Sequence, residues 1–162
     1  MAKGNNIIVS DDPKGRIING YVDGTPLPGT IMQIKAATEP VGNRFTWEAF
    51  NRAADGDRPQ GPIAVLLEDV ISGKTKDDAY VDGDPCRMYC PLPGDMLNVR
   101  WSATGTGTGD SVAIGDLAVV NDGDGLLIDT ASTPESEPFV ALETVADVVA
   151  AGTLVWSMFT GY

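Results

Sequence analysis

Turn-forming residues divide this chain into short apolar runs, and this pattern constrains the fold more than any other feature of the sequence. The 162 residues include 19 Gly and 11 Pro, which fall between the apolar runs. After residue 62 the runs PIAVLLEDV, LAVV, LLID, FVALETV and TLVWSMFTGY are each bounded by turn residues. Frequent turns favour short strands over long helices. The pattern predicts an all-β barrel or sandwich of about eight or nine short strands.

One combination of turn and strand occurs twice. YVDGTPLPG at 21–29 and YVDGDPCRMYCPLPG at 80–94 share their turn residues. The segments that follow, 31–35 and 96–100, repeat the order apolar, apolar, amide, apolar, cation. This repetition predicts a structural unit used twice, with two equivalent strands beginning on opposite sides of one barrel. Chance reuse of good turn residues is the alternative interpretation.

The N-terminal segment differs from the rest of the chain. Residues 1–20 mix Gly, Asn, Asp and Lys around two small apolar clusters, Ile7–Val9 and Ile17–Ile18. Too few apolar groups are present to build a core of their own. We therefore expect an extended N-terminal arm over residues 1–20 and a single β-barrel domain over residues 21–162.

A single short helix is predicted, at residues 46–54. Thr46 can act as an N-cap, and Trp47, Phe50 and Ala54 fall on one helical face. The last apolar run instead alternates with the period of a strand. One of two sets in that run faces the core: Leu154, Trp156 and Met158, or Val155, Ser157 and Phe159.

Charge limits the possible partners. The formal net charge is −12, and residues 101–162 contain nine acidic residues and no Lys or Arg. So acidic a surface repels phosphate backbones, which predicts no binding of free nucleic acid. Solubility is one explanation of the acidity, and an acidic face matched to a basic partner is the other.

Neither export nor membrane insertion is expected. The start MAKGNNIIVSDD has an apolar run of only three residues before two acids, unlike a signal peptide. The most apolar window, 139–159, contains Glu143 and Asp147, unlike a membrane span. We therefore expect synthesis in the cytoplasm and no membrane partner.

The residues that carry chemistry are few. The chain contains no His, which excludes Ser–His and Cys–His nucleophiles and removes the usual nitrogen ligand of zinc. Cys86 and Cys90 would lie about 13 Å apart on one strand, so free thiols are expected unless the stretch between them curls into a loop. No pair of carboxylates stands out as glycosidase residues. We predict no catalytic residue.

Three stretches have features of ligand-binding loops but depart from the patterns. Gly73, Lys74 and Thr75 suggest a phosphate loop, yet the position of its first glycine holds Glu68. The acidic stretches NDGDG and DDAYVDGD lack the calcium-loop ligand spacing and its final Glu. Turn formation by Asp and Asn explains both stretches better, with a weak adventitious cation site as the alternative. We predict no cofactor and no metal.

From residue 62 to the end, the order of motifs resembles the head decoration, or cement, proteins of tailed bacteriophages. Four stretches carry the resemblance: GPIAVLLEDVISG, YVDGDPCRMYCPLPGDMLNVRWSA, AIGDLAVVNDGDGLLIDT and FVALETVADVVAAGTLVWSMFTGY. The resemblance implies a small antiparallel, β-tulip-like barrel that binds the outside of an assembled capsid. It also implies that the protein clamps neighbouring coat subunits, as a homotrimer, on the virion surface.

Within this resemblance, the major capsid protein is the expected partner. The apolar clusters of the arm are the expected contact residues: Ile7, Ile8, Val9, Ile17 and Ile18. Two other functions remain open from the sequence. One is a tail or fibre β-domain that binds a host surface, and the other is a bacterial β-sandwich module that binds a ligand such as a sugar.

Overall fold

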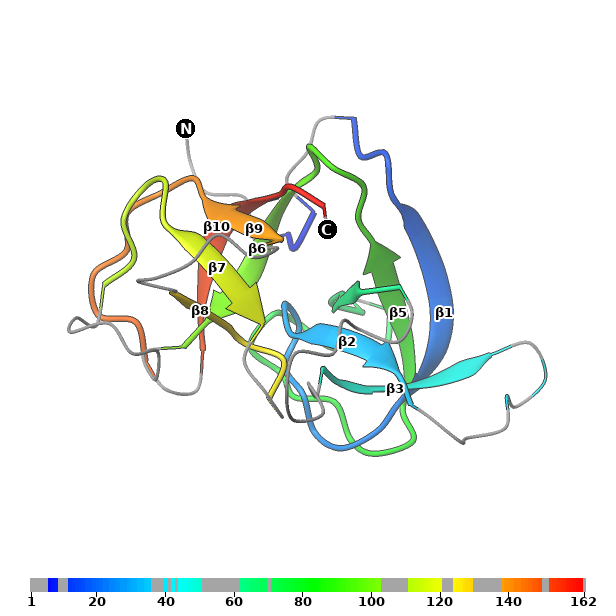
Figure 1. The fold of residues 1–162 in the computed structure, drawn as a ribbon. Helices are drawn as coiled ribbons and strands as arrows, with labels where there is room; N and C mark the ends of the chain where they lie inside the picture. The colour runs from blue at the N-terminus through cyan, green and yellow to red at the C-terminus, as the bar shows by residue number, and fades with distance from the viewer. Residues whose placement is uncertain are drawn as a thin grey trace.

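The computed structural model describes residues 6–8, 12–35, 40, 42, 44–50, 62–69, 71–102, 111–120, 124–129, 138–149 and 152–161. In these residues the chain forms ten β-strands and no helix (Figure 1). The strands are β1 Arg16–Val22, β2 Ile31–Ile34, β3 Phe45–Ala49, β4 Ala64–Leu66, β5 Pro85–Cys90, β6 Met96–Trp101, β7 Leu117–Val120, β8 Leu127–Asp129, β9 Phe139–Ala141 and β10 Thr153–Phe159. Within this described part, no helix has the length and hydropathy needed to cross a membrane.

The strands close into two barrels. In the first barrel the strand order is β1-β3-β2-β4-β5, and in the second it is β10-β6-β8-β7-β9. Figure 1 shows the first barrel on the right and the second on the left. The all-β prediction is confirmed. The chain nevertheless builds two small closed sheets where the sequence predicted one barrel.

The two barrels have the same topology, in the same order along the chain. β1 pairs in parallel with β3 and antiparallel with β5, while β2 pairs antiparallel with β3 and β4, and β4 with β5. In the second barrel β6, β7, β8, β9 and β10 take the places of β1, β2, β3, β4 and β5 in every one of these pairings.

The register repeats as well. Val22 lies opposite Trp47 in the first barrel, and Trp101 lies opposite Leu127 in the second. Hydrogen bonds outside the strands repeat at matching positions: Gly29 N to Leu66 O is 2.8 Å, and Gly115 N to Ala141 O is 2.9 Å. Residues 16–90 and 96–159 are therefore two copies of one five-stranded unit, and we call residues at the same position counterparts.

The repeated sequence does not follow this structural duplication. The two similar stretches precede β2 and β6, but the counterpart of β2 is β7. What they share is a turn: Thr30 N donates to Leu27 O at 3.2 Å, and Asp95 N donates to Leu92 O at 3.0 Å. The third residue of each turn is a glycine with positive φ, 89° at Gly29 and 95° at Gly94. The prediction of two equivalent strands in one barrel is wrong, and reuse of turn residues explains the repeat.

The helix predicted at residues 46–54 is also wrong. Residues 45–49 form strand β3, and residues 51–54 lie outside the described residues. Trp47 is buried in the first barrel, while Thr46 and Glu48 on either side of it are half-buried. Burial of Trp47 in the barrel therefore favours a strand here, despite the helical spacing of Trp47 and Phe50. One tryptophan at the centre of a small barrel fills much of its interior.

Each barrel has an apolar interior. The first is filled by Val22, Met32, Trp47, Ala64, Leu66, Tyr80, Cys86 and Met88. Counterpart positions in the second barrel exchange large for small side chains, as in Val22 and Trp101, or Ala64 and Phe139. The core of the second barrel also continues outward onto the first barrel, because Ile31, Val65 and Tyr89 on the outer face of the first barrel belong to the same buried cluster.

Arg100 lies in the junction between the barrels. Its guanidinium donates to three main-chain carbonyls, Pro28 O at 2.8 Å, Gly152 O at 2.8 Å and Lys76 O at 2.5 Å. Its backbone N also donates to Gly29 O at 3.0 Å. Burial lowers the pKa of Arg100, but a guanidinium stays protonated in proteins. The positive charge is therefore buried at the junction and solvated by carbonyl oxygens from three different segments.

Asp95 orders the segment that joins the barrels. Its carboxylate accepts hydrogen bonds from the backbone N of Lys14, Gly15 and Leu92 and from the Tyr89 hydroxyl, at 2.7–3.0 Å. Burial of this carboxylate raises its pKa, but the hydrogen bonds to the ionised form outweigh that effect and the pKa is lowered. One side chain thus fixes the beginning of β1, the end of β5 and the turn before β6.

We expect Arg100→Met to destabilise the fold strongly. Three buried carbonyls would lose a charged donor, which costs about 3 kcal/mol or more and lowers the melting temperature by roughly 6–12 °C. The matched control is Arg87→Met, at an exposed position of β5, where the change should stay within about 0.5 kcal/mol. Thermal melting measures both, and equal effects of the two substitutions would contradict the role given to Arg100.

We expect Asp95 to make stability depend on acid pH. Because the pKa is lowered in the folded protein, the stabilisation is fully present above the unfolded value of about 3.9 and is lost as the pH falls through the folded value. Asp95→Asn should therefore be less stable than the wild type at neutral pH and show a smaller loss between about pH 5 and pH 2. Denaturant unfolding at several pH values measures this, and parallel pH profiles would contradict it.

Candidate interaction surfaces

The two thiols lie on β5, as residues of one strand. Both cysteines are free, which confirms the prediction of unbridged thiols. Cys86 is buried inside the first barrel and Cys90 is half-buried. Burial raises the pKa of Cys86 to about 12 and also raises the pKa of Cys90. Both stay protonated at neutral pH, and a protonated thiol is a poor nucleophile and metal ligand.

The acidic stretches build turns, as predicted. Asp84 Oδ2 accepts the N–H of Val81 at 2.9 Å, and Asp124 Oδ1 accepts that of Leu126 at 2.9 Å, while residues 121–123 lie outside the described residues. In the described residues, no three His, Cys, Asp or Glu side chains come together as metal ligands. The stretch around Lys74 also folds as a turn, with its Nζ donating to Ala79 O at 2.8 Å. The lysine is occupied by the protein's own backbone.

The predicted contact residues divide into two groups. Ile7 is fully buried in the cluster that joins the barrels, and half-buried Ile8 forms a β-bridge with Leu97. These side chains stabilise the protein itself. Val9 lies outside the described residues. The segment at Ile7 and Ile8 is therefore part of the fold, because the junction offers it a strand edge and an apolar site that the sequence did not reveal.

The second group belongs to β1. Ile17 and Ile18 pair with β5, so residues 16–20 are part of the first barrel and not of an arm. Ile18 is half-buried and packs on the interior of that barrel. Ile17 points outward and is 47% exposed. Of the predicted contact residues in the described part of the chain, Ile17 is the most available to a partner.

A small hollow lies at the junction. It has a volume of about 290 Å³ and is lined by Thr25, Pro26, Leu27, Thr30, Arg100, Asp124 and Leu126. The guanidinium of Arg100 is already bonded to main-chain carbonyls here. The hollow is therefore explained by the packing of the two barrels.

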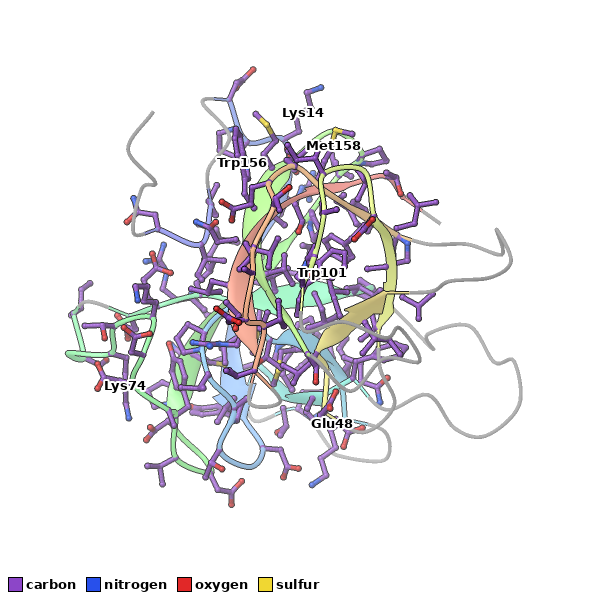
Figure 2. The ribbon with its side chains drawn as sticks, turned by 90° about the vertical axis from the view of Figure 1, so that its left-hand side faces the viewer. Lys14, Glu48, Lys74, Trp101, Trp156 and Met158 are labelled. Atoms are coloured by element: carbon purple, nitrogen blue, oxygen red, sulfur yellow. The ribbon has the colours of Figure 1, made fainter. Side chains whose placement is uncertain are left out.

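The outer face of the second barrel carries an apolar row across four strands. Leu117 on β7 lies opposite Val140 on β9, Val140 lies opposite Met158 on β10, and Met158 lies opposite Met96 on β6. Leu117 is 42% exposed, and the other three side chains are partly exposed. Figure 2 shows Met158 near one end of the molecule, with Trp156 on the same strand. We call these four residues the second row, because they lie on the second barrel.

The sequence indicated one member of the second row, Met158, as a candidate for the outer face. The alternation in β10 predicted two sets of side chains without deciding between them, and the structure buries Val155, Ser157 and Phe159. Leu154, Trp156 and Met158 therefore face outward. The other members of the second row could not be found from the sequence, because they come together only through the pairing of β7 with β9 and of β9 and β6 with β10.

Comparison with known proteins gives limited matches in sequence and a broad match in fold. No family model matches the chain. A segment is 34% identical over 77 residues to human papilin and 30% identical over 78 residues to mouse papilin. These matches cover 48% of this chain but only 6% of each papilin, so the chain spans a small part of those proteins. They do not establish a family.

The fold is similar to that of a solved structure, the crystal structure of the N base of the head fiber protein gp8.5 of bacteriophage phi29. The TM-score is 0.52 at 12% sequence identity, and the match covers 90% of this chain and 94% of the other. At this identity the likeness concerns the fold. The match extends over nearly the full length of both chains, so it covers residues of both barrels.

We expect the native thiols to resist modification. At pH 8 a disulfide reagent should react slowly with Cys90 and not measurably with Cys86, because the thiolate is rare and Cys86 is buried. In denaturant, two thiols per chain should react at once, and Cys86→Ala should reduce the count to one. Rapid reaction of both thiols in the native protein would contradict the burial of Cys86.

Proposed function

We propose that this chain is a structural protein of a tailed-phage virion that binds the outer surface of the assembled capsid and clamps neighbouring coat subunits. The partners are the major capsid protein and further copies of the chain, in a homotrimer. The protein is made in the host cytoplasm and acts on the finished head. Its role is mechanical, and it catalyses no reaction.

The observation that carries this proposal is the fold likeness to the base of a phage head fiber over 90% of the chain. It agrees with the independent resemblance of residues 62–162 to head decoration proteins. Both support a structural protein of a phage, although one rests on the shape of the backbone and the other on the order of turn motifs.

The available side chains support a role in binding rather than in chemistry. The chain has no His, and its two thiols are protonated at neutral pH. Two of the three tryptophans, Trp47 and Trp101, are buried inside the barrels and cannot stack on a sugar ring, and Trp156 alone of the three faces outward. The sugar-binding alternative is therefore less well supported than a protein partner that contacts apolar side chains.

We expect purified protein to co-sediment with empty capsids of its source and to raise the temperature at which those capsids break. Ile17→Glu should reduce occupancy about tenfold, because one buried aliphatic side chain contributes about 1.5–3 kcal/mol. The matched control is Val81→Glu, a second exposed aliphatic residue, on a turn, which should bind as the wild type does. Sedimentation with quantified gels measures occupancy.

Binding to host cells without binding to capsids would favour the alternative function of a tail or fibre domain. Light scattering tests the homotrimer separately. A chain that stays at 17.0 kDa at every concentration, and that decorates capsids as single copies, would remove that part of the proposal.

A further inference from the structure

One face of the first barrel is covered by the second barrel. Ile31, Val65 and Tyr89 lie side by side across β2, β4 and β5, and all three are buried in the cluster shared with the second barrel. Ile17 on β1 continues this row, opposite Tyr89. We call these four residues the first row. Within one chain, the second barrel packs against the first barrel at the first row.

The second row is the counterpart of the first row. The register places Leu117, Val140, Met158 and Met96 at the positions of Ile31, Val65, Tyr89 and Ile17. All eight side chains but Tyr89 are purely apolar. Yet all four positions of the second row are partly exposed, whereas three of the four in the first row, Ile31, Val65 and Tyr89, are buried. The duplicated unit therefore has a face that packs on the other barrel in one copy and is partly exposed in the other.

The surface of the second barrel that packs beside the first row, at Gly29, also has a counterpart. In the second barrel, Asn98, Arg100 and Leu154 make close contacts with the first barrel around Gly29. Their counterparts in the first barrel are Asn19, Tyr21 and Pro85, by the register of β1 with β5 and of β6 with β10. Asn19 and Pro85 are exposed and Tyr21 is half-buried. We call these three residues the β1 face.

The glycines at counterpart positions, Gly29 and Gly115, show the same difference between a covered and an exposed face. A Cβ on Gly29 would lie 2.6 Å from Leu154 Cδ2 and 3.3 Å from Asn98 O, so the second barrel comes too close there for any side chain. The counterpart of Gly29 is Gly115, whose φ of 92° is nearly the same. A Cβ on Gly115 would meet nothing within 4 Å. The space that the second barrel fills beside Gly29 is open beside Gly115.

Charge favours contact between the two open faces. Arg44 is exposed and lies over the ring of Tyr21, with Cζ 5.8 Å from the ring centroid, so it adds a cation to the β1 face. The second row lies in the part of the chain, 101–162, that contains nine acidic residues and no Lys or Arg, apart from Met96 just before it. The cation of Arg44 on the β1 face is therefore complementary to the acidic charge of residues 101–162.

We propose that copies of this chain associate head to tail, with the β1 face of one copy on the second row of the next. The two faces lie on different barrels. Each copy offers one of each face, so the contact is heterologous and continues until a ring closes. The occupant of the second row is thus a second copy of this chain.

One difference between the contact within the chain and the contact between copies lies at Gly125. Gly125 packs so closely that a Cβ there would lie 2.2 Å from Ile31 O. Its counterpart in the first barrel is Phe45, which is 40% exposed. A phenylalanine cannot approach the next barrel as closely as a glycine does. The two chains therefore sit further apart here, and the aromatic ring fills the added space.

Two blocked variants test the proposal. Leu117→Asp places a charge in the second row, and Tyr21→Asp places one in the β1 face. Sedimentation velocity should show an oligomer for the wild type and association at least tenfold weaker for each variant. Ile71→Asp is the matched control, because Ile71 is 94% exposed on a turn outside both faces, and it should associate as the wild type does. Asn19→Asp, which changes no shape, gives a second test of the β1 face and guards against misfolding.

Mixing separates a head-to-tail contact from other modes of association. The Leu117→Asp chain keeps its β1 face and the Tyr21→Asp chain keeps its second row, so an equal mixture should form a 1:1 dimer that does not grow further. A wild type that is monomeric at all concentrations, variants that keep the full oligomer, or a mixture that stays monomeric would each overturn the proposal.

The inference does not rest on what the oligomer binds. Capsid co-sedimentation of the same variants distinguishes the two proposals. Blocked variants that oligomerise normally and decorate capsids would overturn the head-to-tail contact alone. A wild type that oligomerises through these faces but ignores capsids would overturn the proposed function alone.

Discussion

Burial of the outer face of β6 is the constraint on which the arrangement of the two barrels depends. That face carries Arg100 into the junction, where the cost of removing a positive charge from water must be offset by hydrogen bonds. Carbonyls of Pro28, Lys76 and Gly152 supply them, and each comes from a different loop. The relative position of the barrels is therefore specified by polar geometry, while the apolar cluster around Ile31 and Tyr89 provides most of the buried area.

Local features of the fold could be predicted from the sequence, and the arrangement could not. Turns ending in Gly-Asp were visible, and their physical basis is confirmed: the carboxylates of Asp84, Asp95 and Asp116 each accept the N–H of the residue three positions earlier. These bonds are local, so the sequence encodes them directly. The division into two barrels depends on which distant strands pair. The similar turns before β2 and β6 made this division harder to predict, because the same turn residues can precede strands that are not counterparts.

Burial divides the predicted contact residues into those that the fold uses and those that it leaves exposed. Ile17 was expected to be available and is exposed. Ile7 looked the same in the sequence, an aliphatic residue among polar neighbours, but it fills the junction because β6 offers Asn98 as a partner for the adjacent backbone. The second row also could not be predicted from the sequence. Its members come from four strands, and only the pairing of those strands brings them into one line.

The exchange of large and small side chains between counterparts has a consequence for folding. Two units with one topology and one register invite misassembly, in which a strand of one unit enters the barrel of the other. The interiors discriminate against this error. A strand carrying Phe139 in place of Ala64 would overfill the first barrel around Trp47, and one carrying Ala64 in place of Phe139 would leave a cavity in the second. The difference between the two interiors therefore disfavours incorrect strand pairing and keeps each strand in its own unit. For the same reason it limits strand exchange between neighbouring molecules where many copies fold together.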